Sequence, residues 1–318
     1  MPVNPLVRAP QAHPGDPVAP TGEPDADDRF AGHRDPPCVG ITGASGYLGT
    51  RLGEHFDRAG WRVIRLVRTP GAGVASDRYY DLTEPVDPAV FDSIDVLVHA
   101  AYDLTARRAE EVWRNNVDGS RRLIDAARRS GVERIIVLSS MSAYEGTTQL
   151  YGRAKLAIEA ATLAAGGYVV RPGLVWGERP GGMAGALERL CRLPLVPLVA
   201  GGSRQFLVCD VDVAAAVAAL ATTTDLAPQV IGVADPRAER FRTVLETFAR
   251  RQGVRCRFLP VPWRPVHWML RAAEAVRVPL PIRADSLVGL VHPAPGVPGL
   301  EALARLGIRP RPFAVASP

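Results

Sequence analysis

The sequence predicts an α/β protein, in which a parallel sheet carries helices on both faces. Two observations lead to this fold class. From Cys38 onward, short apolar runs alternate with segments of helical periodicity, and this alternation is typical of parallel strands joined by crossover helices. The first apolar run also ends in a glycine-rich turn, "ITGASGYLG", directly before a helical segment. A doubly wound sheet commonly begins with such a turn.

The chain divides into three parts by composition. Residues 1–37 are rich in proline, glycine and aspartate and have hardly any apolar periodicity, which predicts a disordered tail. Residues 38–177 carry the alternation and are expected to form the domain built on the main sheet. In residues 178–318 the alternation loosens. There we expect a smaller substrate-binding region, interleaved with the last part of the sheet.

The individual elements follow from periodicity. Apolar runs predict buried strands within residues 38–43, 61–68, 94–101, 134–140 and 167–175. Helical patterns predict helices at residues 47–60, 109–116, 119–130 and 152–165. Further on, the sequence predicts helices at residues 210–223 and 240–253, and an apolar helix within residues 183–198 that Pro194 and Pro197 interrupt.

Composition argues against several classes of function. The formal charge of +5 comes mostly from scattered arginines, without the basic block and interleaved aromatics of a nucleic-acid interface. The four cysteines are widely separated and the histidines lack ligand spacing, so neither disulfides nor a metal site is expected. There is no secretory leader, and no apolar run approaches the ~18 residues of a membrane span. We expect a cytoplasmic protein that acts on a small molecule, without a nucleic-acid or membrane partner.

The glycine turn predicts dinucleotide binding on a Rossmann-type sheet. Gly43, Gly46 and Gly49 form the pattern GxxGxxG between a strand and a helix. Glycines at these positions allow a tight turn, a close approach of the backbone to a pyrophosphate, and close packing of helix on sheet. An NAD-selective site places an acid at the end of the second strand. Here Val67 takes that position and Arg68 follows, which favours NADP, with NAD as the alternative.

Lysine occurs at one position only, which marks a site. Of the 38 lysines and arginines, Lys155 is the one lysine, four residues after Tyr151. On a helix this spacing puts both side chains on one face. A tyrosine needs a neighbouring positive charge to act as an acid/base near neutral pH, and a compact ammonium meets this need differently from a wide guanidinium. The alternative is a surface pair without a catalytic role.

Two further features converge on the same region. The run "VLSS" ends a predicted strand with Ser139 and Ser140, so a hydroxyl is expected at the carboxyl edge of the sheet, where ligands of such folds bind. Asn115 and Asn116 are two of only three asparagines in the chain. This rarity also indicates a site, although an asparagine pair can serve a helix or a turn.

These motifs resemble those of the extended short-chain dehydrogenases/reductases, in the NAD-dependent epimerase/dehydratase branch. In order, they are TGASGYLG, "DL" at residues 81–82, "HAA", "NVDGS", "LSS", YxxxK, "RPGLVWG" and "VCDVDVA". The resemblance implies an NAD(P)-dependent enzyme that acts as a homodimer. It implies Tyr151 as the acid/base, Lys155 as its partner, Ser140 as a donor to the substrate oxygen, and Asn116 as a support. It implies a cofactor site formed by Gly43, Ser45, Gly46, Tyr47, Leu48, Gly49, Asp81, Leu82, Ala100, Ala101, Tyr151, Lys155, Pro172, Gly173 and Leu174, beside Arg68.

Departures from the family pattern guide the choice of reaction. Met141 and Ser142 follow Ser140 where dehydratases carry an acidic pair, and Gln205 follows Arg204 where epimerases usually carry an aspartate. His99 replaces a more common asparagine and is interpreted as structural. We therefore expect an oxidoreductase that transfers hydride to or from a carbonyl or secondary alcohol of a small organic substrate. The alternatives are a sugar-nucleotide epimerase with tightly bound cofactor and a non-catalytic NADP-binding sensor or assembly protein.

Overall fold

The computed structural model describes residues 36–276, 278 and 283–313. The described residues form one compact unit, and the predicted tail, apart from residues 36 and 37, lies outside them. The boundary at residue 177 stays a prediction. None of the helices in the described ranges is long and apolar enough to cross a membrane.

The sheet confirms the predicted fold class. Seven strands pair in parallel in the order β11-β6-β5-β4-β1-β2-β3. The order reverses beside β1 and β4, which creates the crevice where such sheets bind ligands. The strands are β1 (Cys38–Thr42), β2 (Arg62–Val67), β3 (Asp77–Tyr79), β4 (Val96–His99), β5 (Arg134–Leu138), β6 (Tyr168–Pro172) and β11 (Val230–Val233).

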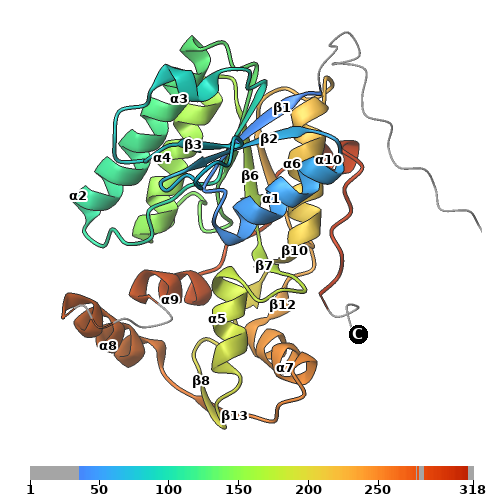
Figure 1. Cartoon of the computed structure of the whole chain (residues 1–318). Coiled ribbons are helices and arrows are strands. Elements are labelled where there is room, and N and C mark those ends of the chain that lie inside the picture. Colours follow the sequence, from blue (N-terminus) through green and yellow to red (C-terminus); the bar gives the residue numbers. More distant parts are fainter. Residues whose placement is uncertain (1–35, 277, 279–282, 314–318) are drawn as a thin grey trace, which may run out of the picture. The chain divides into compact units, whose positions relative to one another are not determined.

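Helices cover both faces of this sheet (Figure 1). One face carries α1 (Tyr47–Arg58), α6 (Asp210–Thr222) and α10 (Leu300–Arg305). The other carries α2 (Ala109–Val112), α3 (Gly119–Arg129) and α4 (Leu150–Ala164), with a 3-10 turn at Pro88–Phe91. Each layer has its own apolar core, because strands buried on both faces alternate their side chains between the two.

The two helices predicted at residues 109–116 and 119–130 are one continuous helical segment. A π-helical stretch, Trp113–Asp118, joins α2 to α3. The extra residue of a π-turn rotates the side chains that follow it, and such turns are frequent at functional sites.

The second region contributes small sheets and helices below the carboxyl ends of the main strands (Figure 1). Within it, β8 (Leu195–Leu198) pairs with β13 (Arg257–Pro260), and β9 (Arg204–Gln205) pairs with β12 (Glu239–Arg240). Its strand β10 (Leu207–Cys209) pairs with β7 (Leu174–Trp176), which lies at the end of the first region. Its helices are α5 (Gly182–Leu190), α7 (Phe241–Arg251), α8 (Trp263–Ala275) and α9 (Ala284–Val291).

One predicted helix is shorter than expected. The apolar segment at residues 183–198 forms α5 only to Leu190, and residues 195–198 form strand β8. Pro194 and Pro197 disfavour a continued helix, and pairing with β13 gives the apolar residues a different partner. The main sheet also takes its last strand, β11, from this part of the chain, so the two regions are interleaved.

Candidate active site

A cavity of about 1120 Å³ opens at the carboxyl ends of the main strands. We call its two halves the cofactor end and the substrate end. The cofactor end is lined by residues 43, 45–49, 66–68, 80–83 and 100–101. The substrate end is lined by Asp103–Thr105, Met141, Ser142, Gln149, Gly182, Met183, Ala186, Gln205, Phe206, Arg283, Asp285, Ser286, Gly289, Leu290 and His292–Ala294. Ser140, Tyr151, Lys155 and Pro172–Leu174 lie on its wall as well.

The glycine turn is shaped for a close approach of backbone to ligand. Gly43 has a φ of 65°, and a Cβ atom there would lie 2.9 Å from the backbone of Ala101. A Cβ on Gly49 would collide with the carbonyl of Gly43. Ser45, Gly46 and Leu48 line the cavity between these two positions. Only glycine fits at either end of the turn, and its backbone has the shape that a pyrophosphate cradle requires.

His99 supports this cradle from behind. Thr42 Oγ1 lies 2.7 Å from His99 Nδ1 and accepts the backbone N–H groups of Ala100 and Ala101 at 3.1 Å each. His99 Nε2 lies 2.8 Å from Ser120 Oγ. A neutral ring satisfies all these contacts if Nδ1 accepts from Thr42 and Nε2 donates. Burial, assisted by the charge of Lys155, lowers the pKa of His99 to about 3. His99 is therefore structural and stays neutral.

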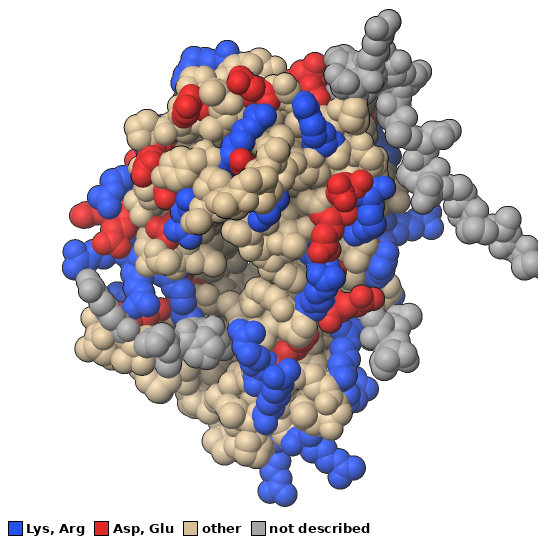
Figure 2. All heavy atoms as spheres, in the orientation of Figure 1, with Lys and Arg blue, Asp and Glu red and all other residues tan. Residues whose placement is uncertain are grey.

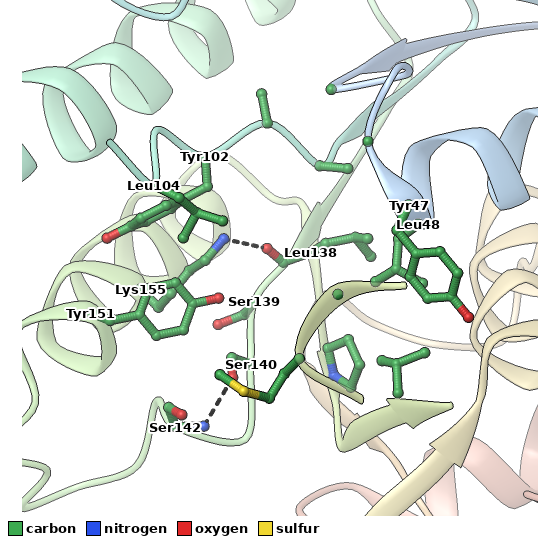
Figure 3. Close-up of a pocket in the computed structure, with 18 of the residues that line it drawn as sticks. Tyr47, Leu48, Tyr102, Leu104, Leu138, Ser139, Ser140, Ser142, Tyr151 and Lys155 are labelled. Carbon is green, nitrogen blue, oxygen red and sulfur yellow. Dashed lines mark hydrogen bonds between the residues drawn. The ribbon is translucent and has the colours of Figure 1, made fainter. Parts of the chain in front are cut away.

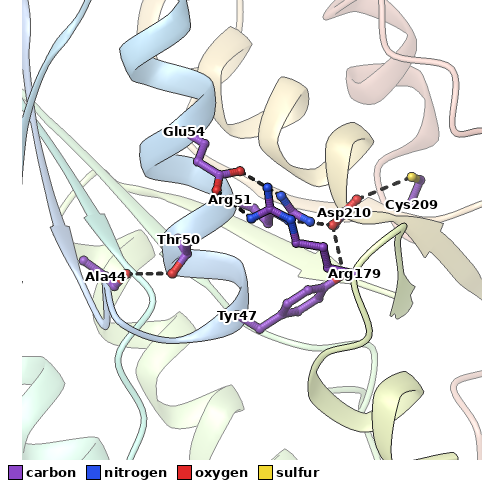
Figure 4. A network of polar contacts seen from close by, with 8 residues as sticks. All are labelled: Ala44, Tyr47, Thr50, Arg51, Glu54, Arg179, Cys209 and Asp210. Carbon is purple, nitrogen blue, oxygen red and sulfur yellow. Dashed lines mark hydrogen bonds and ion pairs between the residues drawn. The ribbon is translucent and has the colours of Figure 1, made fainter. Parts of the chain in front are cut away.

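Tyr47 joins the glycine turn to the loop at residues 177–182 (Figure 4). Its hydroxyl donates to Asp210 at 2.9 Å, and a Cβ on Gly181 would collide with its ring. Arg179 of the loop pairs with Glu54 of α1 at 3.1 Å. The predicted pyrophosphate residue Tyr47 thus lines the cavity while its hydroxyl is engaged with Asp210.

Ser140, Tyr151 and Lys155 are brought together at the middle of the cavity. Figure 3 shows the Tyr151 ring pointing to the serines at the end of β5. Burial raises the pKa of Tyr151 to about 12, and a hydrogen bond from Ser140 acts in the opposite direction. The Tyr102 ring packs edge-on against Tyr151 at 4.9 Å between centroids. In this environment Tyr151 is a neutral phenol at physiological pH and can donate a proton.

Lys155 is held by the strand that carries the serines. Its Nζ donates to the Leu138 carbonyl at 2.7 Å and lies 5.9 Å from the centre of the Tyr151 ring. Burial lowers the pKa of Lys155 to about 8, and Glu159 one turn away acts in the opposite direction. Glu159 accepts from the Ser139 hydroxyl and pairs with Arg171. This network fixes α4 against β5 and β6, and so fixes the lysine beside the tyrosine.

Asn116 does not face the cavity. Its Oδ1 accepts the Asp103 N–H at 2.6 Å and its Nδ2 donates to the Asp103 carbonyl at 3.3 Å. The side chain is fully buried in the π-helical stretch. In this structure Asn116 anchors the segment after β4, whose residues 103–105 line the substrate end.

The residues predicted to select and hold the adenosine lie at the cofactor end. Asp81 and Leu82 line it after β3, and Arg68 lines it after β2. Arg68 is exposed and forms no hydrogen bond or ion pair with any residue that the structure describes. Val67 occupies the strand end where an acid would contact a ribose hydroxyl. The residues present fit a dinucleotide, and the Arg68 guanidinium is available to bind a phosphate group.

Sequence reasoning missed Gln149 and Asp285. Both line the substrate end. Asp285 accepts the backbone N–H groups of Leu150 and Tyr151 at 3.0 Å each, from a position 135 residues along the chain from Leu150. No local pattern indicates that pairing. Gln149 could have been noticed as the glutamine two residues before the YxxxK motif.

Among the described residues no group of three or more His, Cys, Asp and Glu side chains could hold a metal ion. The charged side chains on the face in Figure 2 are mixed in sign. On this face, arginines alternate with aspartates and glutamates.

Comparison with known proteins decides the family. The model of the "NAD dependent epimerase/dehydratase family" matches residues 39–233, which is more than half of the chain. The chain belongs to this family. It is an extended short-chain dehydrogenase/reductase and, as such, an NAD(P)-dependent oxidoreductase.

Two curated relatives align with more than two thirds of this chain. It is 29% identical over 238 residues to the ceramide reductase of Caulobacter vibrioides, covering 70% of this chain and 73% of that protein. It is 29% identical over 273 residues to dTDP-6-deoxy-L-talose 4-dehydrogenase (NAD(P)(+)) of Kitasatospora kifunensis, covering 73% and 84%.

Solved structures of other proteins share the fold of this chain. MoeE5 in complex with UDP-glucuronic acid and NAD has a TM-score of 0.67 at 22% identity, covering 87% of this chain and 94% of that one. UDP-glucose 4-epimerase of Thermus thermophilus in complex with NAD has a TM-score of 0.62 at 21% identity, covering 86% and 94%.

Proposed function

We propose that this chain reduces the ketone, or oxidises the secondary alcohol, of a small organic substrate, with NADP as the preferred cofactor. The observation that carries the proposal is the convergence of Ser140, Tyr151 and Lys155 on one cavity, next to the glycine turn. Similarity to a ceramide reductase and to a 4-dehydrogenase supports a net redox reaction.

We assign a role to each side chain from its position in the cavity. When bound, the dinucleotide supplies or accepts the hydride. In reduction, the neutral Tyr151 phenol donates its proton to the substrate oxygen as negative charge develops there. The Ser140 hydroxyl donates a hydrogen bond to the same oxygen. Protonated Lys155 favours the phenolate left behind, and Asn116 keeps the segment after β4 in place. In oxidation the same steps run in reverse.

The preference for NADP is supported by Arg68. The cofactor end combines an unpaired guanidinium after β2 with Val67 in the position of the usual acid. A 2′-phosphate would gain charge-assisted hydrogen bonds there, whereas a ribose hydroxyl would find no carboxylate. The rest of the adenosine and ribose site would be lined by Asp81, Leu82, Ala100 and Ala101.

Tyr151→Phe tests the proposed function. The variant removes the transferred proton and keeps the ring packed against Tyr102. Turnover in a screen of ketones followed by nicotinamide absorbance should fall by roughly 10²–10⁴-fold, while NADPH affinity measured by fluorescence stays within a few-fold of wild type. Unchanged turnover in the folded variant would show that Tyr151 is not the acid/base.

A sugar-nucleotide epimerase is the second candidate, favoured by the likeness to UDP-sugar enzymes. An epimerase returns its hydride and needs no external cofactor in net terms. Conversion of UDP-glucose without net absorbance change would favour the epimerase. Cofactor binding without conversion of any ketone or sugar nucleotide would favour the sensor or assembly protein.

We also propose that the enzyme is a homodimer, formed through α4 and the helical segment that begins at α2. These helices lie together on one outer face of the sheet (Figure 1). Light scattering on the purified protein should give twice the chain mass of 34.1 kDa. A monomer at working concentrations would rule the dimer out.

A further inference from the structure

The side-chain amide of Gln149 lines the substrate end and has no partner. Gln149 is only 3% exposed. Its Nε2 is buried without a hydrogen bond in the part of the chain that the structure describes. The residue lies two positions before Tyr151, at the N-cap of α4. Buried amides almost always find a partner in the folded chain, so an unpaired amide at a cavity indicates a group that meets its partner in the ligand.

The amide is free because a different residue caps the helix. An N-cap side chain normally accepts the first free N–H groups of its helix. Here Asp285 of α9 accepts the N–H groups of Leu150 and Tyr151, one on each carboxylate oxygen. A Cβ on Gly289 would lie 2.9 Å from Gln149 Oε1, so α9 packs tightly on the amide and limits its movement. The arrangement leaves the Gln149 Nε2 donor without a hydrogen bond among the described residues.

Charge at the substrate end disfavours an anionic substrate. Arg283 is the one arginine or lysine among the described residues that line it. Its guanidinium already donates to the carbonyls of Leu104 and Ala106 at 2.9 and 3.1 Å. Asp285 adds a carboxylate. A diphosphate needs several free cationic partners. Among the described residues this end offers only the Arg283 Nε, which has no hydrogen bond and lies 4.0 Å from a Glu274 carboxylate oxygen.

The remaining lining is largely apolar. Side chains from five separate segments contribute to it, namely Leu104, Met141, Met183, Ala186, Phe206 and Leu290. A pocket of this kind gains affinity from apolar surface and uses few polar groups to orient its ligand.

We propose that Gln149 hydrogen-bonds a neutral amide or hydroxyl group next to the reacting carbonyl of an uncharged, otherwise apolar ketone. The inference rests on the proposed function and names the substrate class of that site. Gln149 and Tyr151 line the same cavity, so a ligand that meets Tyr151 lies in the cavity that Gln149 also borders. An amide or hydroxyl matches the donor and acceptor of the glutamine, and the apolar lining holds the rest of the chain.

Two probe ketones test this assignment on the full-length enzyme with NADPH. One is a long-chain methyl ketone, and the other carries an acetamido group on the carbon next to the carbonyl. Wild type should reduce the acetamido ketone with a kcat/KM about 10- to 100-fold higher, as for a buried hydrogen-bonding group that its ligand satisfies. Gln149→Met should remove this preference, so that the ratio of kcat/KM for the acetamido ketone to kcat/KM for the plain ketone falls to about 1.

The controls separate the possible failures. Gln229→Met changes a glutamine that does not line the cavity and should retain the preference. Equal rates for the two probes with wild type, or a preference that survives in Gln149→Met, would overturn the role of Gln149 and leave the proposed function standing. Conversion of UDP-glucose and of neither ketone would overturn the apolar substrate class. Full activity of Tyr151→Phe on either ketone would instead overturn the proposed function.

Discussion

The two ends of the cavity are built from different kinds of parts. The cofactor end consists mainly of backbone and small side chains from successive strand ends, each supplied by a short motif. The substrate end consists of side chains from segments scattered between residues 103 and 294. A motif can specify a backbone turn, because the turn depends on neighbouring residues. It cannot specify a surface that forms only when distant segments meet.

The difference extends to the catalytic residues between the two ends. Lys155 is fixed by its own helix and by the neighbouring strand. The start of that helix is fixed by Asp285 from the substrate end. Helix α4 therefore connects the cofactor end to the substrate end, and variants on either side should have separable effects.

Replacing Arg68 tests whether the cofactor end acts independently. Arg68→Ala should weaken NADPH by roughly 10- to 100-fold, because a charge-assisted contact to the 2′-phosphate is lost. NADH affinity should change little, and KM for the ketone should stay the same. Titration of both cofactors by fluorescence measures this, with Arg58→Ala on the exposed side of α1 as the matched control. Equal weakening of both cofactors would contradict the assignment.

Replacing Lys155 tests the junction between the two ends. Lys155→Arg keeps the charge, but the wider guanidinium does not fit where the ammonium donates to the Leu138 carbonyl. Turnover should fall at least about tenfold, with the basic limb of the pH profile shifted or lost. The melting temperature serves as the folding control. If Lys155→Arg kept the turnover and the pH profile of wild type, the lysine would give no support to the proposed role of Tyr151.

The support behind the cofactor end should be sensitive to acid. The folded pKa of His99 is depressed to about 3 from 6.5. Below pH 6.5 His99 becomes protonated in the unfolded chain but stays neutral in the folded chain. The free energy of unfolding therefore falls as pH decreases toward 3. The slope is at most ~1.4 kcal/mol per pH unit. Denaturant unfolding of wild type and of His99→Asn between pH 7 and 5 isolates the contribution of His99 to this slope. Parallel stability curves would show that His99 tolerates charge.

The smallest effect is expected at the cap from the substrate end. Asp285→Ala should lower the free energy of unfolding by about 1 kcal/mol, because two N–H groups at the start of α4 lose their acceptor. It should raise the ketone KM and leave NADPH affinity unchanged. Asp285→Asn keeps an acceptor and should recover part of the loss. A matching loss of NADPH affinity would show that the two ends are not independent.

Much of the fold was predictable from the sequence because its signals are local. Alternating periodicity identified five strands of the parallel sheet, and the glycine spacing identified the cradle. The i, i+4 spacing of Tyr151 and Lys155 placed both on one helix face, and the strand end at Ser140 brought a hydroxyl to them. These predictions needed only the backbone geometry of a few residues. They also used the fact that the carboxyl ends of parallel strands lie at the same edge of a sheet.

Tertiary structure decided what depends on distant segments. Periodicity could not show that β11 completes the sheet or that residues 195–198 pair as a strand. It could not show that Asn116 turns to the backbone of Asp103, away from the cavity. Nor could it show that Asp285 caps α4 and leaves the Gln149 amide free. A side chain's hydrogen-bond partner is set by which segments pack together, and packing is a property of the whole chain.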